Sequence, residues 1–313
     1  MRAFAIDRYK TPGSIHDLPT PEPDANEILV KLGAAGVNPV DWKTRDGNGD
    51  KPLPLVLGQD FAGTVERVGA DVHDVVAGDR VFGMAREHGA YAEYTAVAND
   101  GRGSTYAKIP GGIGDDVAAA LPTAGLTALA ALVWLGAANG SSVVIVGATG
   151  GVGAFAVQLA RERGARVIAV VKDAKRELAT SLGAAETIAY DREDVVPAIE
   201  ALAPGGVDAV LDLTSDADTL KTFTAVLKPG AKIVSTIHVA DEAWFTARGF
   251  GASNIALPDT PQASPESLEQ LAALVSSGSV SVKLERTAPL ADAASVLEAS
   301  KAGTLGGKAV LIP

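Results

Sequence analysis

The sequence predicts an α/β protein in which a doubly wound, parallel β-sheet follows a smaller unit of short strands. Six strand candidates follow one another between residues 143 and 257, helical segments separate most of them, and this rhythm is typical of a complete doubly wound sheet. Residues 1–110 instead contain short strand candidates between Gly and Pro turns, at a spacing typical of a compact β unit. From residue 280 onward the chain returns to this second character, which makes the parallel sheet an insertion.

The most informative stretch, residues 141–173, predicts a strand, a glycine-rich turn, a helix and a second strand. Residues 143–146 are apolar without alternation, as expected of a parallel strand that is covered on both faces. Residues 152–163 have one apolar face and predict a helix that Gly164 ends. Residues 167–171 then form the next apolar run, so the stretch reads as one β-α-β unit.

The turn in this unit contains four glycines, which let the backbone adopt positive φ and let a ligand approach the main chain. The free N–H groups at the start of the helix favour an anion such as a pyrophosphate. The pattern is Ala148-x-Gly150-x-x-Gly153, without the usual first glycine, so an ordinary glycine-rich turn is the alternative. The flanking strands and helix favour a dinucleotide site instead. Its expected cofactor contacts are Gly147, Thr149, Gly150, Gly151 and Val152.

The end of the second strand decides which dinucleotide is expected. An NAD site places a carboxylate about 20 residues past the glycines, to hold the ribose 2′-OH. This slot lies near Lys172, and Lys172, Lys175 and Arg176 form a basic cluster suited to a 2′-phosphate. Asp173 would fit a ribose hydroxyl or the N-cap of the following helix. The sequence therefore favours NADPH over NADH, and a solvated charge cluster is the alternative.

The remaining segments complete two predicted domains. Strands are expected at residues 3–6, 27–35, 63–68, 80–83, 91–97, 143–147, 167–171, 186–190, 207–213, 231–237 and 252–257. Helices are expected at 115–137, with a break near 122–125, and at 266–276, where Pro265 suits the first turn. A strand at 280–284, a helix at 291–302 and a strand at 308–312 are too few to form their own core and should pack on the first domain. The expected domains are 1–115 with 280–313, and 116–279.

Composition narrows the classes of function. The 313 residues carry a net charge of −11, which argues against nucleic acid or an anionic membrane surface as partner. No apolar run reaches the length of a membrane helix, and the first residues lack a signal-peptide core, so a cytoplasmic location is expected. The chain has no cysteine and only four scattered histidines, so no metal site is expected.

Several short motifs share an order and spacing that are far more specific together than singly. They are Gly36-Val37-Asn38-Pro39-Val40-Asp41, Gly58-Gln59-Asp60-Phe61-Ala62-Gly63-Thr64-Val65, Gly78-Asp79-Arg80-Val81-Phe82-Gly83, Gly89-Ala90-Tyr91-Ala92-Glu93-Tyr94, Leu126-Thr127-Ala128, the glycine turn and Gly307-Lys308-Ala309-Val310-Leu311. With them the chain resembles the medium-chain dehydrogenase/reductase superfamily over nearly its whole length, and most of all its zinc-free quinone oxidoreductases. The resemblance implies a GroES-like β domain with a Rossmann domain inserted before the C-terminal segment.

The same resemblance bears on metal and cofactor. Zinc-bearing alcohol dehydrogenases of the superfamily have a cysteine where Asn38 stands and a histidine where Gln59 stands, so the chemistry implied here is zinc-independent. In NADPH-using members, a lysine and a tyrosine lie near the adenosine phosphate, at positions that Lys172, Lys175 and Tyr190 match, although the usual serine is Val171. Asn38 and Thr127 match residues at the nicotinamide end.

The implied function is NADPH-dependent hydride transfer to quinones or to the activated C=C bond of enones or alkenals. Many quinone oxidoreductases have a tyrosine where Lys43 stands, and residues 38–43 look more like the enone/alkenal branch. Hydride addition creates an enolate-like oxygen, for which Lys43, the Asn38 amide or main-chain N–H groups are the candidate donors. The expected substrate is a small apolar electrophile, and relatives suggest a homodimer, for which edge pairing of residues 253–257 is a candidate contact. The alternatives are an enoyl reductase acting on thioesters and a non-enzymatic NADPH-binding relative.

Overall fold

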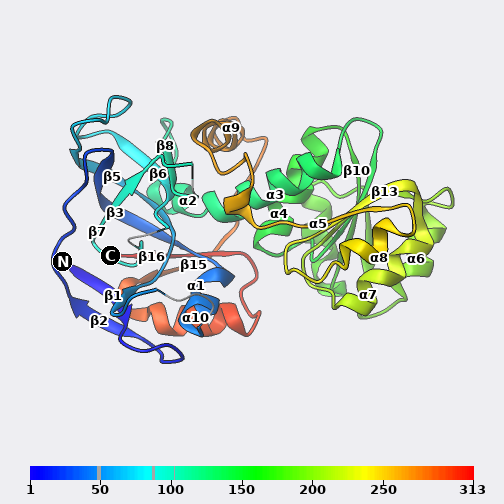
Figure 1. Ribbon diagram of the computed structural model, residues 1–313. Helices are drawn as coiled ribbons and strands as arrows, with labels where there is room; N and C mark the ends of the chain where they lie inside the picture. The colour runs from blue at the N-terminus through cyan, green and yellow to red at the C-terminus, as the bar shows by residue number, and fades with distance from the viewer. Residues whose placement is uncertain (48–50, 87–88, 102) are drawn as a thin grey trace. The chain divides into compact units, whose positions relative to one another are not determined.

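The computed structural model describes residues 1–47, 51–86, 89–101 and 103–313. Its contacts divide the chain into two compact units, Met1–Leu126 with Ala263–Pro313, and Thr127–Gln262 (Figure 1). The expected boundaries were 115/116 and 279/280. They differ because helix α2 (Asp115–Ala119) contacts strands β3 and β5 of the first unit, and helix α9 (Pro265–Ser276) contacts its strand β8.

The first unit contains two β-sheets. One has the strand order β2-β1-β4, and the other has the order β15-β16-β3-β5-β6-β8, with β7 also paired to β3. The strands are β1 (Arg2–Ile6), β2 (Ser14–Asp17), β3 (Glu27–Val37), β4 (Leu55–Val56), β5 (Asp60–Val68), β6 (Arg80–Met84), β7 (Tyr94–Ala98), β8 (Thr105–Lys108), β15 (Leu284–Pro289) and β16 (Lys308–Ile312). Strand β16 pairs antiparallel with β3, so the C-terminal segment returns to this unit as expected.

Some predicted boundaries in this unit are wrong. The strand expected at 280–284 starts at Leu284, because the Val280 N–H donates to the Leu274 carbonyl and closes the end of α9. The helix expected at 115–137 breaks at residues 120–121, and Pro122 begins helix α3 (Pro122–Leu135), as proline suits a first turn. Strand β7 starts at Tyr94, while Ala92 makes only an isolated bridge with Ala3.

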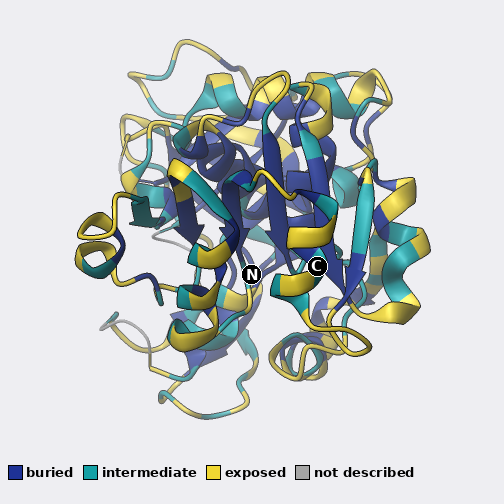
Figure 2. Ribbon diagram, turned by 90° about the vertical axis from the view of Figure 1, so that its right-hand side faces the viewer, coloured by how far each residue is buried: buried dark blue, intermediate teal, exposed yellow. Residues whose placement is uncertain are grey.

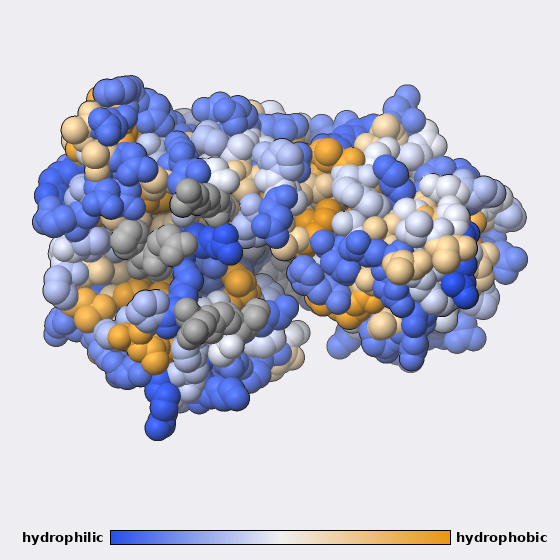
Figure 3. Space-filling model, viewed as in Figure 1, coloured by the Kyte–Doolittle hydropathy of each residue, from blue (hydrophilic) through white to orange (hydrophobic). Residues whose placement is uncertain are grey.

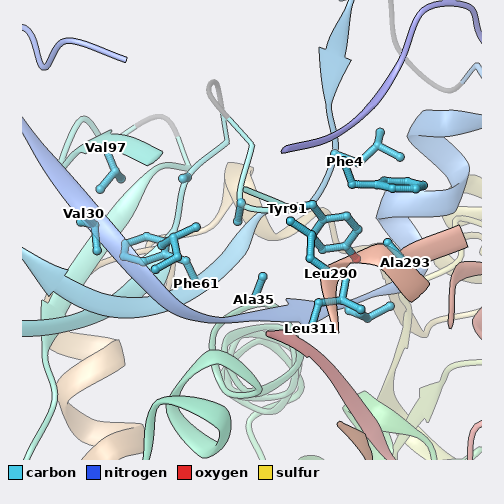
Figure 4. Packing of buried hydrophobic residues seen from close by; sticks show 14 of the residues in the cluster. Phe4, Val30, Ala35, Phe61, Tyr91, Val97, Leu290, Ala293 and Leu311 are labelled. Carbon is cyan, nitrogen blue, oxygen red and sulfur yellow. The ribbon is translucent and has the colours of Figure 1, made fainter. Parts of the chain in front are cut away.

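An apolar core joins the elements of the first unit (Figure 4). Phe61 packs near Val30 and Val97, and Tyr91 lies near Leu290, from the C-terminal segment. Helix α10 (Ala293–Lys301) adds buried residues to the same core. Burial of large side chains contributes about 1.5–3 kcal/mol each, so the C-terminal segment stabilises the β unit it returns to.

The second unit is built on one six-stranded sheet whose strand pairs are all parallel. Its strands are β9 (Ser142–Val146), β10 (Arg166–Val171), β11 (Glu186–Ala189), β12 (Val207–Asp212), β13 (Leu227–Ser235) and β14 (Gly251–Asn254). The order β11-β10-β9-β12-β13-β14 reverses between β9 and β12, which is where doubly wound folds bind ligands. Figure 2 shows buried strands beneath helices with exposed outer faces, which confirms the predicted Rossmann-like layering.

Candidate active site

The glycine turn of the second unit joins β9 to helix α4 (Gly151–Glu162). Gly147 directly follows β9 and has φ +82°, a conformation that L side chains rarely adopt. Gly150 is the N-cap residue of α4, and no side chain caps the helix start. The first N–H groups of α4 thus remain available to an external acceptor, which suits an anion.

Two glycines of this turn have different steric roles. A Cβ atom at Gly153 would lie 2.2 Å from the Gly147 carbonyl oxygen, so this glycine lets the helix pack against the turn. A Cβ at Gly150 would meet only that same oxygen, at 3.4 Å, and Gly150 is exposed. The backbone at Gly150 is therefore open to close approach from outside. This geometry fits the pyrophosphate of a dinucleotide, which Thr149, Gly151 and Val152 would flank.

The carboxyl ends of β10 and β11 bring the predicted phosphate-binding residues together. Val171 pairs with Ala189, so Lys172 and Tyr190 follow adjacent strand positions, and both side chains are exposed. Lys175 follows within a short 3₁₀ turn and is half-buried. In the described part of the chain, neither Lys172 nor Lys175 forms an ion pair, so both charges can face a bound anion.

The neighbouring Asp173 and Arg176 already form ion pairs within the protein. The Asp173 carboxylate accepts a hydrogen bond from Arg176 Nε at 3.2 Å and lies 3.6 Å from Arg192 Nε. Arg176 also binds the Glu193 carboxylate. The alternative that Asp173 caps the following helix is wrong, because Lys175 is the N-cap residue of helix α5 (Arg176–Ser181) and no side chain caps its start. A ribose hydroxyl would have to compete with two arginines for Asp173.

In the first unit, Asn38 is the N-cap residue of helix α1 (Pro39–Arg45), and its side chain is buried between two charged groups. Its Nδ2 atom donates to Asp60 Oδ2 at 2.8 Å, and its Oδ1 accepts from Lys308 Nζ at 2.5 Å. Lys308 Nζ also donates to the Val37 carbonyl at 3.0 Å. These contacts fix the orientation of the amide and leave one Nδ2 hydrogen for a further acceptor.

Asp60 is fully buried and accepts from the Thr123 backbone N–H at 3.0 Å and from its hydroxyl at 2.5 Å. Burial raises the pKa of the Asp60 carboxyl and lowers the pKa of the Lys308 ammonium, because both charged forms lose hydration. Their opposite charges oppose these shifts. The site therefore contains a buried acid and base on either side of Asn38.

One carboxyl oxygen of Asp41 accepts hydrogen bonds, and the other has no donor among the described residues. Its Oδ2 accepts from the Asn38 N–H at 2.7 Å and from the Tyr91 hydroxyl at 2.8 Å. Its Oδ1 is buried and has no hydrogen-bond partner in the described part of the chain. Burial raises the pKa of Asp41 to about 7. The i, i+4 spacing of Asp41 and Arg45 predicts an ion pair on a helical turn. This prediction is wrong, because Arg45 instead binds Asp46 and Glu298.

A small cavity adjoins Asp41. Its volume is about 30 Å³, and its lining includes Asp41, Thr44, Gln59, Lys51 and Arg86. A cavity of this size holds about one water molecule, and polar walls favour its occupation. Gln59, the position of a zinc ligand in alcohol dehydrogenases, thus shares a cavity with Asp41.

Two further predicted site residues lie on helices α1 and α3. Lys43 is half-buried on α1, and its Nζ atom lies 5.8 Å from the centroid of the Trp42 ring. No contact of Lys43 with Asn38 or with the cavity occurs among the described residues. Thr127 is buried in α3. The roles predicted for these two residues stay predictions.

The residues that the sequence analysis missed are Asp60, Tyr91, Thr123 and Lys308. Asp60, Tyr91 and Lys308 all lie inside the motifs that carried the family resemblance, and each is a polar residue beside an apolar run. That combination was the available signal for a buried polar network.

Clusters of metal-ligating side chains and membrane-spanning helices are both absent from the ranges that the structure describes. Within these ranges, no group of three or more histidine, aspartate or glutamate side chains could hold a metal ion. No described helix has both the length and the apolar character needed to cross a bilayer. Figure 3 shows hydrophilic residues over most of the visible face, with small apolar areas between them.

Comparison with known proteins gives matches to both units. Residues 24–120 match the family described as alcohol dehydrogenase GroES-like domain, and residues 151–277 match the family described as zinc-binding dehydrogenase. The chain is 37% identical to the NADPH-dependent alkenal/one oxidoreductase of Arabidopsis thaliana, over 69% of its own length but only 56% of that relative. It is 31% identical to a chloroplast envelope quinone oxidoreductase homolog of Arabidopsis thaliana, over 95% of the chain and 92% of the relative.

Among solved structures, the Escherichia coli quinone oxidoreductase in complex with NADPH superposes with a TM-score of 0.89 at 26% identity. The match covers the whole of both chains. The predicted fold class and the predicted family resemblance are thereby confirmed.

Proposed function

Because the chain belongs to the medium-chain dehydrogenase/reductase superfamily, among the quinone oxidoreductases, we propose that it reduces quinones or activated C=C bonds with NADPH. The observation that carries this proposal is the glycine turn at the point where the strand order of the parallel sheet reverses. There the start of α4 lacks a side-chain cap, and Gly150 leaves the backbone open. A quinone and an alkenal are both small apolar electrophiles, and relatives that carry each name are similar to this chain.

In the proposed mechanism, a bound reduced nicotinamide supplies the hydride. The N-terminus of α4 and the turn at Gly147–Gly153 would hold the pyrophosphate, while Lys172, Lys175 and Tyr190 would hold the 2′-phosphate. Asn38 and Thr127, which match residues at the nicotinamide end in the family, would each contact the nicotinamide. Lys43, the free hydrogen of the Asn38 amide or a main-chain N–H steadies the developing oxyanion.

The preference for NADPH is tested with Lys172→Ala/Lys175→Ala. Loss of charge-assisted hydrogen bonds costs about 1.5–3 kcal/mol, so the Kd for NADPH should rise by roughly 10- to 100-fold. The Kd for NADH should stay within about twofold, since that ligand lacks the 2′-phosphate. Fluorescence titration measures both, with Arg248→Ala as a control on the same unit. Equal weakening of both cofactors would contradict the assignment.

The role proposed for Lys43 is tested with a matched pair of lysines. Lys43 and Lys301 both lie over the Trp42 ring, with Nζ atoms 5.8 Å and 5.9 Å from its centroid. Loss of an oxyanion donor lowers turnover by about 10²–10³-fold, which is the result expected for Lys43→Ala on enones. Lys301→Ala should keep wild-type turnover, because Lys301 instead binds Asp46. Unchanged turnover in Lys43→Ala would end its proposed role.

We also propose that the reaction is zinc-independent. Uncharged amides stand at both ligand positions, and the Asn38 amide is engaged by Asp60 and Lys308. The match to the zinc-binding dehydrogenase family covers residues 151–277, which do not include Asn38 or Gln59. Turnover should therefore survive dialysis against a chelator.

One assay separates the candidate functions. NADPH oxidation is followed with 1,4-benzoquinone, with an alkenal and with an acyl thioester, each with and without chelator. Activity with the first two supports the proposed function, and activity with the thioester alone supports an enoyl reductase. Tight NADPH binding without turnover of any acceptor would indicate a non-enzymatic relative.

Two further expectations remain proposals. Strand β14 is the edge strand of its sheet, which suits pairing with a second copy, and a homodimer is proposed on that ground. A cytoplasmic location is proposed from the sequence alone.

A further inference from the structure

A polar pocket lies at the C-terminal end of helix α1, the opposite end from the Asn38 network. Its volume is about 460 Å³, which is in the range of sites for small molecules. Its walls come from α1, from α10 and from the turn between β1 and β2, which Figure 1 shows side by side in the first unit. Three cations and two carboxylates line it: Lys10, Arg45, Lys301, Asp46 and Glu298.

Arg45 directs free hydrogen-bond donors into this pocket. It is only 3% exposed, and because it lines the pocket, its accessible part opens there. Its Nε donates to Asp46 Oδ1 at 2.9 Å, and its Nη1 donates to Glu298 Oε1 at 2.5 Å. Nη2 makes no hydrogen bond among the described residues, and it does not belong to the fully enclosed polar atoms that lack a partner. The two N–H groups of Nη2 can therefore reach a ligand in the pocket.

Lys10 adds a cation that has no counter-ion. Among the described residues it forms no ion pair, and its backbone N–H donates to the Arg45 carbonyl at 2.8 Å. A Cβ atom at Gly47 would lie 3.9 Å from Lys10 Cε, so the lysine side chain extends toward the end of α1. Lys10 has φ +63°, a left-handed conformation that is uncommon for a long side chain. Backbone strain of this kind clusters at ligand-binding sites.

The charges in the pocket select the class of ligand. Lys301 Nζ donates to Asp46 Oδ2 at 2.7 Å, so Arg45 and Lys301 together pair with both carboxylates and Lys10 remains as one surplus positive charge. A carboxylate carries one negative charge and would neutralise this surplus. A phosphate group carries roughly two negative charges at neutral pH and would leave an excess. The C-terminal ends of α1 and α10 have partial negative charge, which disfavours that excess further.

We propose that this pocket binds a small organic carboxylate, whose oxygens accept hydrogen bonds from Arg45 Nη2 and Lys10 Nζ. The planar guanidinium matches the geometry of a carboxylate, and both groups are donors only, so the site selects an acceptor. The organic part of the ligand would lie against Thr11 and Pro12, which also line the pocket. Quinones, enones and alkenals carry no charge, so the ligand of this site differs in class from the proposed substrates.

Binding is measured with benzoate as the probe, by NMR titration of the full chain. The backbone amides of Lys10 and Gly47 report on the pocket itself, so binding elsewhere does not disturb the result. We expect their shifts to saturate with a Kd of about 1 mM, as befits a small ligand with few contacts. Benzamide has the same shape without the charge and should not saturate. Inorganic phosphate should bind more weakly than benzoate at the same amides.

Four variants test the two donors. Lys10→Asn removes the cation, and asparagine tolerates the left-handed conformation, so the fold should persist while the Kd for benzoate rises about fivefold. Lys10→Arg should restore wild-type affinity. Arg45→Lys keeps a charge for its two carboxylate partners but loses the planar fork, so the Kd should rise about tenfold. Lys108→Asn is the control, because Lys108 pairs with Asp79 in the same unit and does not line the pocket.

Three results would overturn the site. They are shifts at Lys10 and Gly47 that show no saturation by about 10 mM benzoate, ten times the expected Kd, benzamide binding equal to that of benzoate, and wild-type affinity in Lys10→Asn. Lys10→Asn decides the matter even if Arg45→Lys fails to fold. Tighter binding of phosphate than of benzoate would overturn the choice of a carboxylate. Lack of reductase activity would count against the proposed function and leave this site unaffected.

Discussion

The Gly150→Ala variant is expected to fold as stably as wild type and to bind NADPH roughly 10- to 100-fold less tightly, a loss of about 1.4–2.7 kcal/mol. The backbone at Gly150 has φ −75°, which any residue adopts, and the new Cβ would have only the Gly147 carbonyl oxygen nearby, at 3.4 Å. The fold therefore tolerates the methyl group. A pyrophosphate that approaches the start of α4 would not, because the methyl group would occupy its side of the turn.

Gly153→Ala is the matched counterpart. Its Cβ would lie 2.2 Å from the Gly147 carbonyl oxygen and 2.8 Å from two backbone atoms of Ala148, and neither can move aside cheaply. Overpacking of this kind costs about 1–3 kcal/mol, so Tm should fall by roughly 2–4 °C per kcal/mol for a domain of this size. Thermal unfolding and NADPH titration of both variants provide the test. If Gly150→Ala bound NADPH like wild type, the pyrophosphate site would lie elsewhere.

The parallel sheet was predictable from the sequence because its central strands are buried on both faces. Central strands such as β9 and β10 are uninterrupted apolar runs, whereas the edge strands β11 and β14 are only partly buried and were expected from the regular alternation of strands and helices. Some strand ends are shifted, since strand β13 starts at Leu227 and not at residue 231. The short strands β2 and β8 were missed, since four residues are too few to establish an alternating pattern.

The candidate site was predictable only where it is local. The glycine turn and the start of α4 lie within a few residues of each other, so spacing alone identifies them. The network around Asn38 is different, because Lys308 binds an amide 270 residues earlier in the chain and Tyr91 binds a carboxylate 50 residues earlier. These contacts depend on the register between strands that are distant in the chain. That register cannot be predicted from a single sequence.

The same network explains why the predicted partner of Asp41 is wrong. The i, i+4 spacing to Arg45 is a sound reason to expect an ion pair on an exposed helix face. Here both side chains are buried, and each finds a partner from another element: Tyr91 for Asp41, and Glu298 for Arg45. Tertiary contacts therefore override local spacing wherever a short helix is covered on both sides.

The second large effect is expected in the pH dependence of stability. As pH rises, the free energy of unfolding of Asp41→Asn should increase relative to that of wild type. The pKa of Asp41 is raised from 3.8 to about 7 in the folded protein, so between these values the folded state binds a proton that the unfolded state has released. Stability therefore falls as pH rises through this window, by about 4 kcal/mol for three pKa units at 1.36 kcal/mol each. Asparagine does not ionise, so the free energy of unfolding of the variant does not fall for this reason as pH rises.

Equilibrium urea unfolding at pH 5 and pH 8 measures the effect without any cofactor. An experiment that starts at pH 5 samples only the change in wild-type stability between pH 5 and about 7. The free energy of unfolding of Asp41→Asn relative to wild type should therefore increase by about 3 kcal/mol from pH 5 to pH 8. Asp46→Asn is a control of opposite sign: Arg45 lowers the pKa of Asp46, so its contribution to stability is lost at acid pH and not at neutral pH. A difference between Asp41→Asn and wild type that stays constant from pH 5 to pH 8 would mean that Asp41 is ionised throughout and that burial does not raise its pKa.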